Sequence, residues 1–239
     1  MKRIISLILS AVLALSLSAC GNGNNENADI SEQQAIAENT SAENNSQSES
    51  NEDTTGEKSD TNILIAYFTA AENSGVDAVS SASYSMVNGE PVGRLRAIAN
   101  IIQAKTGGEL FSIQTSVIYP TDGGELIEYA AEEQANDARP ELTSHIDDLE
   151  QYNVIFVGYP NWWADLPQVM YSFFDEYDFS GKTIIPFNVH NGSRLSRTVE
   201  TIAELEPEAA VETNAFTISE HNVSEAEKEV TDWLEELGY

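Results

Sequence analysis

The fold of this chain is constrained most by a regular alternation of short apolar runs and longer amphipathic segments after residue 61. The run at 62–68 is continuously apolar, which is typical of a strand buried on both faces of a sheet. The run at 153–157 has the same character and ends at Gly158. With three similar segments, the pattern predicts strands over 62–68, 109–114, 153–157, 183–187 and part of 210–218.

Apolar residues recur at helical spacing between these runs. The predicted helices cover 93–105, 124–137, 167–174, 195–205 and 224–237, the last with Ser224 as its N-cap. Strands that alternate with helices form parallel sheets joined by right-handed crossovers. The sequence therefore predicts an α/β fold with five parallel strands and helices on both faces of the sheet.

The first twenty residues have the composition of an export signal. Lys2 and Arg3 precede an apolar run at 4–17, which is too short for a comfortable transmembrane helix. The ending Leu17-Ser-Ala-Cys20 resembles a lipobox, and Cys20 is the only cysteine in the chain. We expect residues 1–20 to be a lipoprotein signal peptide with Cys20 lipidated, and an ordinary signal peptide is the alternative. Lipidation predicts an extracytoplasmic protein anchored to the cytoplasmic membrane.

Residues 21–60 consist mostly of Asn, Ser, Glu and Gln, with almost no large apolar side chains. Such a segment buries too little surface to offset the entropy lost on ordering, so it is predicted to be a disordered acidic linker. The remaining residues, 61–239, have the length of one ordinary domain with one core. No cysteine remains in that domain for a disulfide or a cysteine-based metal site.

The charge of the chain excludes one class of function. With 40 acidic and 11 basic residues, the formal net charge is −29, which repels nucleic acid and anionic membranes. The same charge suits a soluble carrier that docks on basic partners, and it suits simple solubility equally well. The three histidines stand far apart and no G-x-S-x-G elbow is present, so neither a metal site nor a serine hydrolase is predicted.

Ligands of open parallel sheets bind beyond the carboxyl ends of the strands, so the loops after the first, third and fourth strands are the candidates. The first loop begins with small and hydroxyl residues whose backbone N–H groups suit a phosphate. A segment at 76–91 separates this loop from the next helix, and a polar surface loop is the alternative. The candidate phosphate-binding residues are Thr69, Ala70, Ala71, Asn73, Ser74, Gly93 and Arg94.

The second loop, 158–167, crowds aromatic side chains at the mouth of the sheet between two prolines. A planar, electron-poor ring is well held by stacked aromatic side chains, although tryptophans in a loop also pack into cores. Two adjacent residues in a loop seldom both point inward, so at least one indole is expected to line a pocket. The candidate residues are Tyr159, Pro160, Asn161, Trp162 and Trp163.

The third loop follows the strand at 183–187. Its amides suit hydrogen bonds to the polar edge of a ring, and His190 would favour an anionic reduced ring if it were charged. A hydrogen-bonded histidine with only a loop role is equally consistent with the sequence. The candidates are Asn188, His190, Asn191, Gly192 and Ser193.

These loops resemble those of the flavodoxin family, most closely in Gly158-Tyr-Pro-Asn-Trp-Trp163. The resemblance runs from about residue 63 to the C-terminus. The first loop departs from the family pattern Ser/Thr-x-Thr-Gly-Asn-Thr, because it reads Thr69-Ala-Ala-Glu-Asn73, and Glu72 would repel a phosphate unless it points away. The supporting segments are Ile65-Ala-Tyr-Phe-Thr69, Tyr129-Ala-Ala-Glu-Glu-Gln134, Arg139-Pro-Glu-Leu142 and Asp178-Phe-Ser-Gly-Lys-Thr183.

The resemblance implies a flavodoxin-like three-layer sandwich with strand order 2-1-3-4-5. It implies FMN as cofactor, with the phosphate in the first loop and the ring between the second and third. The implied function is electron transfer with a redox partner that the sequence does not identify. An NAD(P)H-dependent reductase of quinones or other small molecules is one alternative. A binding lipoprotein that kept the fold and lost the cofactor is another, favoured by the altered first loop.

Overall fold

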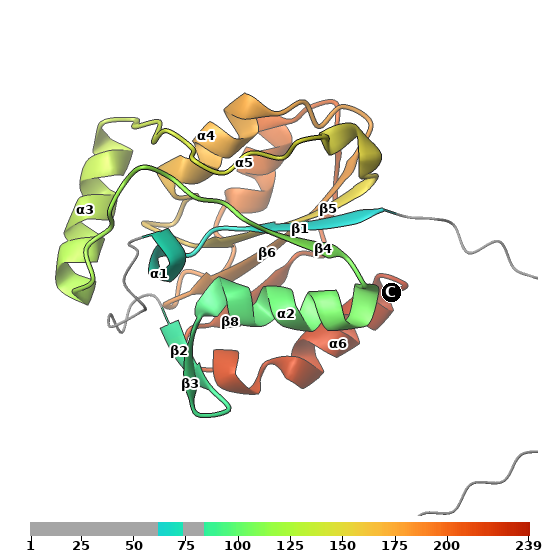
Figure 1. Cartoon of the computed structure of the whole chain (residues 1–239), viewed down its shortest axis with the longest axis horizontal. Coiled ribbons are helices and arrows are strands. Elements are labelled where there is room, and N and C mark those ends of the chain that lie inside the picture. The colour runs from blue at the N-terminus through green and yellow to red at the C-terminus, as the bar shows by residue number, and fades with distance from the viewer. Residues whose placement is uncertain (1–61, 74–83) are drawn as a thin grey trace, which may run out of the picture. The chain divides into compact units, whose positions relative to one another are not determined.

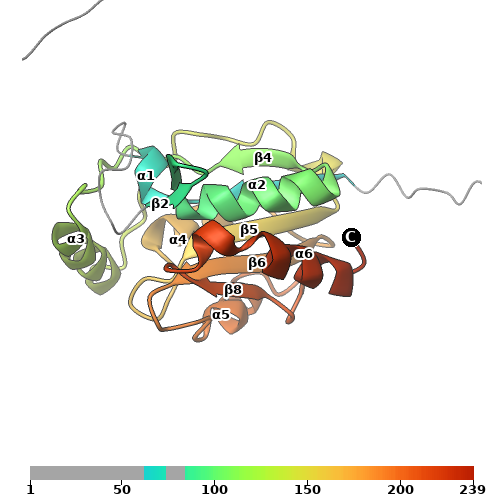
Figure 2. The same ribbon diagram turned by 90° about the horizontal axis from the view of Figure 1, so that it is seen from below.

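The computed structural model describes residues 62–73 and 84–239. The predicted signal peptide, Cys20, the linker and Ser74 lie outside these residues. Figures 1 and 2 show a central sheet with helices on both of its faces. Its strands are β1 (Ile63–Tyr67), β4 (Glu109–Ser112), β5 (Val154–Pro160), β6 (Thr183–His190), β7 (Ala210–Val211) and β8 (Phe216–Ser219).

The sheet has the order β4-β1-β5-β6, and β6 pairs with both β7 and β8 on its outer side. Every pairing in it is parallel. The predicted order 2-1-3-4-5 is confirmed, with the fifth strand divided into two short ones. The division occurs where the backbone N–H of Asn214 donates to the Glu212 side chain at 2.7 Å, which turns the chain away from the sheet.

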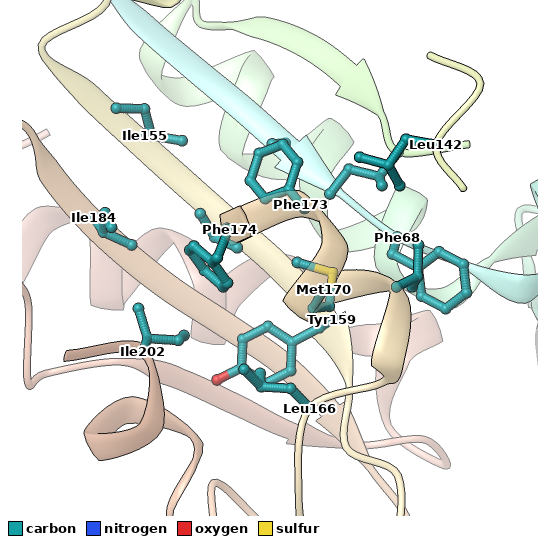
Figure 3. Close-up of a cluster of buried hydrophobic side chains, with 14 of the residues drawn as sticks. Phe68, Leu142, Ile155, Tyr159, Leu166, Met170, Phe173, Phe174, Ile184 and Ile202 are labelled. Atoms are coloured by element: carbon teal, nitrogen blue, oxygen red, sulfur yellow. The ribbon is translucent and has the colours of Figure 1, made fainter. Parts of the chain in front are cut away.

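The helices form the two outer layers. Helices α2 (Arg94–Thr106) and α6 (Glu227–Glu236) share one apolar cluster with the sheet. The opposite face carries α4 (Gln168–Glu176) and α5 (Thr198–Leu205), with α3 (Gly123–Ala135) packed beside α4. Figure 3 shows the apolar cluster under α4 and α5, in which Met170, Phe173 and Ile202 meet Ile155 and Ile184 of the sheet.

The predicted helix boundaries agree with the structure within three residues, but the predicted N-cap of the last helix was wrong. Ser224 lies inside a separate 3-10 turn, η2 (Val223–Glu225), and Ala226 occupies the N-cap of α6 without a side-chain hydrogen bond. The turn forms because the backbone N–H of Glu225 bonds to the Asn222 carbonyl. A second 3-10 turn, η1 (Leu149–Gln151), precedes β5.

The segment between the first strand and α2 contains two elements that the alternation did not predict. A single helical turn, α1 (Ala70–Asn73), follows β1. Before α2, β2 (Tyr84–Val87) and β3 (Glu90–Gly93) form an antiparallel hairpin. Its turn residues Asn88 and Gly89 both have positive φ, the geometry for which Asn-Gly is preferred. Within residues 62–73 and 84–239, no helix is long and apolar enough to cross a membrane.

Candidate functional site

A cavity of about 600 Å³ lies beyond the carboxyl ends of β1, β5, β6 and β8. Figure 1 shows α1 and α3 at this end of the sheet. The size is that of a typical small-molecule site. The lining comprises Thr69, Ala70, Arg94, Leu95, Asp122, Gly123, Gly124, Leu126, Ile127, Ala130, Pro160, Asn161, Trp162, Trp163, Ala164, Val189, His190, Asn191, Ser193 and Glu220.

One end of the cavity is formed by a tight turn that carries both indoles. The backbone N–H and C=O groups of Trp162 and Asp165 bond to each other at 3.0 Å in both directions. The two residues between them, Trp163 and Ala164, have φ of 53° and 63°. Glycine and asparagine are the usual residues in such a left-handed two-residue turn. A bulky residue held there is strained, and strain of this kind clusters at ligand sites.

The two indoles are held in different ways. The half-buried Trp162 ring meets the rings of Phe68 and Tyr119 edge-on, each at a centroid distance of 5.6 Å. Trp163 is 55% exposed, and its Nε1 donates to the carbonyl of Ile127 in α3 at 3.1 Å. Trp162 is thus anchored in the core, whereas Trp163 spans from its turn to α3. The prediction that at least one indole lines a pocket is confirmed, because both do.

Two other residues of this loop have separate roles. Tyr159 does not line the cavity: it is fully buried, its hydroxyl donates to Thr198 Oγ1 at 2.8 Å, and burial raises its pKa. Figure 3 shows its ring inside the apolar cluster. Asn161 lines the cavity and donates through Nδ2 to the carbonyl of Arg194 at 2.7 Å. Its Oδ1 is buried and has no hydrogen-bond partner among the described residues.

Thr69 and Ala70 bring the first loop to the other end of the cavity, whereas Ala71 and Asn73 do not line it. Asn73 braces the loop instead. Its Nδ2 donates to the carbonyls of Thr69 and Ile113, and its Oδ1 accepts from the backbone N–H of Thr115. A buried amide bonded on both sides fixes the loop and is not available to a ligand.

Glu72, the residue that departs from the family pattern, is turned away from the cavity lining. Its carboxylate accepts from the hydroxyls of Tyr67 at 3.1 Å and Ser112 at 2.7 Å. Nη1 of Arg96 lies 3.7 Å from the same carboxylate. The repulsion expected between Glu72 and a phosphate is therefore not supported by this geometry.

The N-terminus of α2 reaches the cavity beside Thr69. Its N-cap residue, Gly93, makes no side-chain cap hydrogen bond, and the first N–H groups of a helix suit an anion. A Cβ on Gly93 would lie 2.9 Å from Thr69 Cγ2, so glycine allows the two segments to approach closely. Arg94 and Leu95, the first residues of the helix, line the cavity, whereas Gly93 does not.

Arg94 is already engaged with a residue that the sequence analysis missed. Its Nη1 lies 3.4 Å from Oε2 of Glu220, and its Nε donates to Ser85 Oγ at 3.3 Å. Burial lowers the pKa of Arg94 and the nearby carboxylate raises it. Glu220 directly follows β8. The rule that ligands bind beyond the carboxyl ends of parallel strands would have indicated Glu220 if the end of the fifth strand had been predicted.

The third loop contributes His190, Asn191 and Ser193, whereas Asn188 and Gly192 do not line the cavity. Asn188 is fully buried, donates to the Arg194 carbonyl and accepts from Thr217. His190 Nδ1 accepts from the backbone N–H of Gly192 at 2.9 Å, which places the ring proton of a neutral imidazole on Nε2.

Burial and then Arg194 lower the pKa of His190. The imidazole is therefore predominantly neutral at pH 7. The expectation that a charged His190 favours an anionic ring is not supported by this geometry.

The side of the cavity formed by α3 was also missed. Asp122 caps α3 by accepting from the backbone N–H groups of Gly124 and Glu125. An aspartate directly before a helix is an N-cap signal, but the loop before α3 follows the edge strand β4, whose end was not among the three candidate loops. Among the described residues, no group of three or more His, Cys, Asp or Glu side chains is placed to hold a metal ion.

The lining as a whole suits a flat ring with an anionic tail. The lining includes the indoles of Trp162 and Trp163, called the aromatic end below, and Thr69 and Arg94 at the start of α2, called the phosphate end. Apolar pockets with a few convergent polar groups are the usual form of cofactor sites.

The family model described as Flavodoxin matches residues 90–237, which is more than half of the chain. Comparison with curated proteins finds no significant match. A crystal structure of an inferred flavoprotein from Bacteroides eggerthii is 22% identical, covers 75% of this chain and 99% of that protein, and has a TM-score of 0.57. An inferred flavoprotein from Bacteroides uniformis is 22% identical, covers 73% of this chain and 98% of that protein, and has a TM-score of 0.56.

A third structure is that of a flavoprotein from Lactobacillus acidophilus in complex with FMN. It is 17% identical, covers 73% of this chain and 99% of that protein, and has a TM-score of 0.50. At these identities the likeness concerns the fold.

Proposed function

Because this chain belongs to the flavodoxin family, we propose that its domain binds FMN in the cavity and acts in electron transfer. The observation that carries the proposal is that one cavity joins the indoles of Trp162 and Trp163 to the uncapped N-terminus of α2 and Thr69. The FMN bound by the Lactobacillus acidophilus flavoprotein supports the choice of ring. When bound, FMN supplies the electron chemistry, and the protein supplies binding and orientation.

In this proposal, different residues bind the ring and the phosphate of FMN. Trp162 and Trp163 provide aromatic surface for the ring. The N–H groups at the start of α2 and the guanidinium of Arg94 attract the phosphate. His190 remains a neutral imidazole, so it adds no positive charge beside the ring.

We also propose that the domain is tethered by lipid to the outer face of the cytoplasmic membrane. The support is the sequence Lys2-Arg3, the apolar run at 4–17 and the lone Cys20. Incorporation of a labelled fatty acid into the native chain, and its loss in Cys20→Ser, is the expected result. A chain that takes up no label in the producing cells contradicts the tether and leaves the flavin proposal unaffected.

Titration of the purified full-length protein with FMN tests the flavin proposal. The third tryptophan, Trp233, lies in α6 against Phe156 and Phe216, away from the cavity lining. The variant Trp233→Phe therefore reports on the two cavity indoles alone. We expect FMN to quench this fluorescence and to show an altered visible spectrum.

A protein that leaves the FMN spectrum unchanged at millimolar FMN would contradict the proposal and favour a domain that lost its cofactor. Oxidation of NAD(P)H by the flavin-loaded protein, with a quinone as acceptor, separates a reductase from an electron carrier. We expect an electron carrier to oxidise NAD(P)H no faster than free FMN does.

A further inference from the structure

Glu220 places a carboxylate at the end of the cavity assigned to the phosphate. It follows β8, and its backbone N–H donates to the carbonyl of His190 at 2.8 Å. Its Oε2 lies 3.4 Å from Nη1 of Arg94, and the two side chains are only 19% and 10% exposed. The residue thus lies between the third loop and the start of α2.

The charged residues that line the cavity do not favour an anion, because the acidic ones outnumber the basic ones. Among the described lining residues, Arg94 is the only lysine or arginine, and Asp122 and Glu220 are the acidic ones. Asp122 is occupied with the N–H groups of its own helix. Glu220 is therefore the carboxylate that shares the cation with any incoming phosphate.

We propose that Glu220 is the specificity-determining residue that sets how much the phosphate contributes to flavin binding, by holding Arg94 in an internal ion pair. This inference rests on the proposed flavin function of the same cavity. A phosphate at the α2 N-terminus must share Arg94 with Glu220 or displace it, and in either case it meets a second negative charge. A flavin without a phosphate meets no such opposition.

The consequence is weak selection between FMN and riboflavin in the native protein. Neutralising Glu220 removes the negative charge that lies beside Arg94 and competes with the phosphate. Because the phosphate then no longer meets a second negative charge a few ångströms away, we expect Glu220→Gln to tighten FMN binding by about tenfold or more. The dissociation constant of riboflavin, which has no phosphate, is expected to change less than about threefold.

The experiment measures dissociation constants of FMN and riboflavin for the full-length native protein, Glu220→Gln and Glu236→Gln. Glu236 supplies a matched control, because it is exposed and lies at the end of α6 next to Glu235, which pairs with Lys105 at the opposite end of α2. Both variants remove one negative charge. The readout is the ratio of the riboflavin constant to the FMN constant, which cancels any common effect on folding.

A ratio that rises about tenfold in Glu220→Gln and stays at the native value in Glu236→Gln supports the inference, as does FMN binding that appears only in Glu220→Gln. A ratio that is unchanged or falls in Glu220→Gln overturns it while leaving flavin binding in place. A rise of equal size in both variants also overturns it, because the effect is then one of net charge. Absence of binding of either flavin to all three proteins overturns the proposed function itself.

Discussion

The two ends of the cavity are built in opposite ways. The aromatic end comes from one continuous loop, in which Trp162 is wedged against Phe68 and Tyr119 and the turn is closed by two backbone bonds. The phosphate end is assembled from three distant segments, represented by Thr69, Arg94 and Glu220. The first is fixed by packing, whereas the second is held by a largely buried ion pair.

This difference separates rigidity from adjustability within one site. A packed aromatic residue in a core moves only at a cost of several kcal/mol, whereas a charged side chain in an ion pair can exchange its partner for a charged ligand. We therefore expect the aromatic end to fix the position of a ring and the phosphate end to tune affinity.

The same substitution at two glycines contrasts the two ends most strongly. A Cβ at Gly158 would lie 2.2 Å from Cζ of Phe187, its buried register partner in β6. At Gly93 it would meet only the side chain of Thr69 at 2.9 Å. We expect Gly158→Ala to lower the free energy of unfolding by about 3 kcal/mol and Gly93→Ala by about 1 kcal/mol or less. Urea denaturation of both variants measures the difference.

A control shows whether the clash is the cause. The double variant Gly158→Ala/Phe187→Leu removes the ring that the new methyl group meets. Its loss of unfolding free energy is expected to be smaller than the sum of the losses in the two single variants, by about 1 kcal/mol or more. Equal losses at Gly158 and Gly93 would remove the contrast between the two ends.

The contrast also explains what could be predicted from the sequence. The alternation of strands and helices predicted the parallel sheet with helices on both faces, and the family resemblance implied the strand order. The aromatic end was predicted because its residues are contiguous in Gly158-Tyr-Pro-Asn-Trp-Trp163. Tyr159 was the exception in that loop, since a strand alternates its faces and β5 continues through Pro160.

The phosphate end could be predicted only in part. Thr69 and Arg94 were found because they flank recognisable elements, but Glu220 depends on where β8 ends. That boundary follows from a division of the last strand, and the short segments Ala210–Val211 and Phe216–Ser219 carry little pattern of their own. Brace residues such as Asn73 and Asn188 have the same composition as ligand-binding residues, so only their bonds distinguish them.

A titrating group beneath the aromatic end sharpens the comparison further. Glu133 of α3 is 7% exposed, and the Tyr119 hydroxyl lies 3.5 Å from both of its carboxylate oxygens. Burial raises the pKa of Glu133 to about 7, against an ordinary value near 4.3 in the unfolded chain. The folded state therefore holds the proton more tightly. This stabilisation is complete below pH of about 4 and is lost as the pH rises through about 7.

We expect the native protein to lose about 2 kcal/mol of unfolding free energy between pH 5 and pH 8 relative to Glu133→Gln, which cannot ionise. Urea denaturation of both proteins at the two pH values gives the difference. The comparison with the variant is needed because Glu206 also has a pKa raised by burial to about 7. Parallel pH profiles for the two proteins would show that Glu133 does not titrate in this range.

The smallest effect concerns the strain in the turn that carries Trp163. Trp163→Ala and Trp163→Gly both remove the indole and its bond to the Ile127 carbonyl, so the two variants differ only in the cost of a φ of 53°. A left-handed conformation costs a residue with a Cβ about 1 kcal/mol more than glycine, although glycine also loses more entropy on folding. Glycine destabilises regular strands and helices, but in this turn we expect Trp163→Gly to be as stable as Trp163→Ala or more stable, by at most about 1 kcal/mol.

Urea midpoints of the two variants test this prediction. A glycine variant that is clearly less stable than the alanine variant would mean that the turn is unstrained and that packing alone fixes the aromatic end.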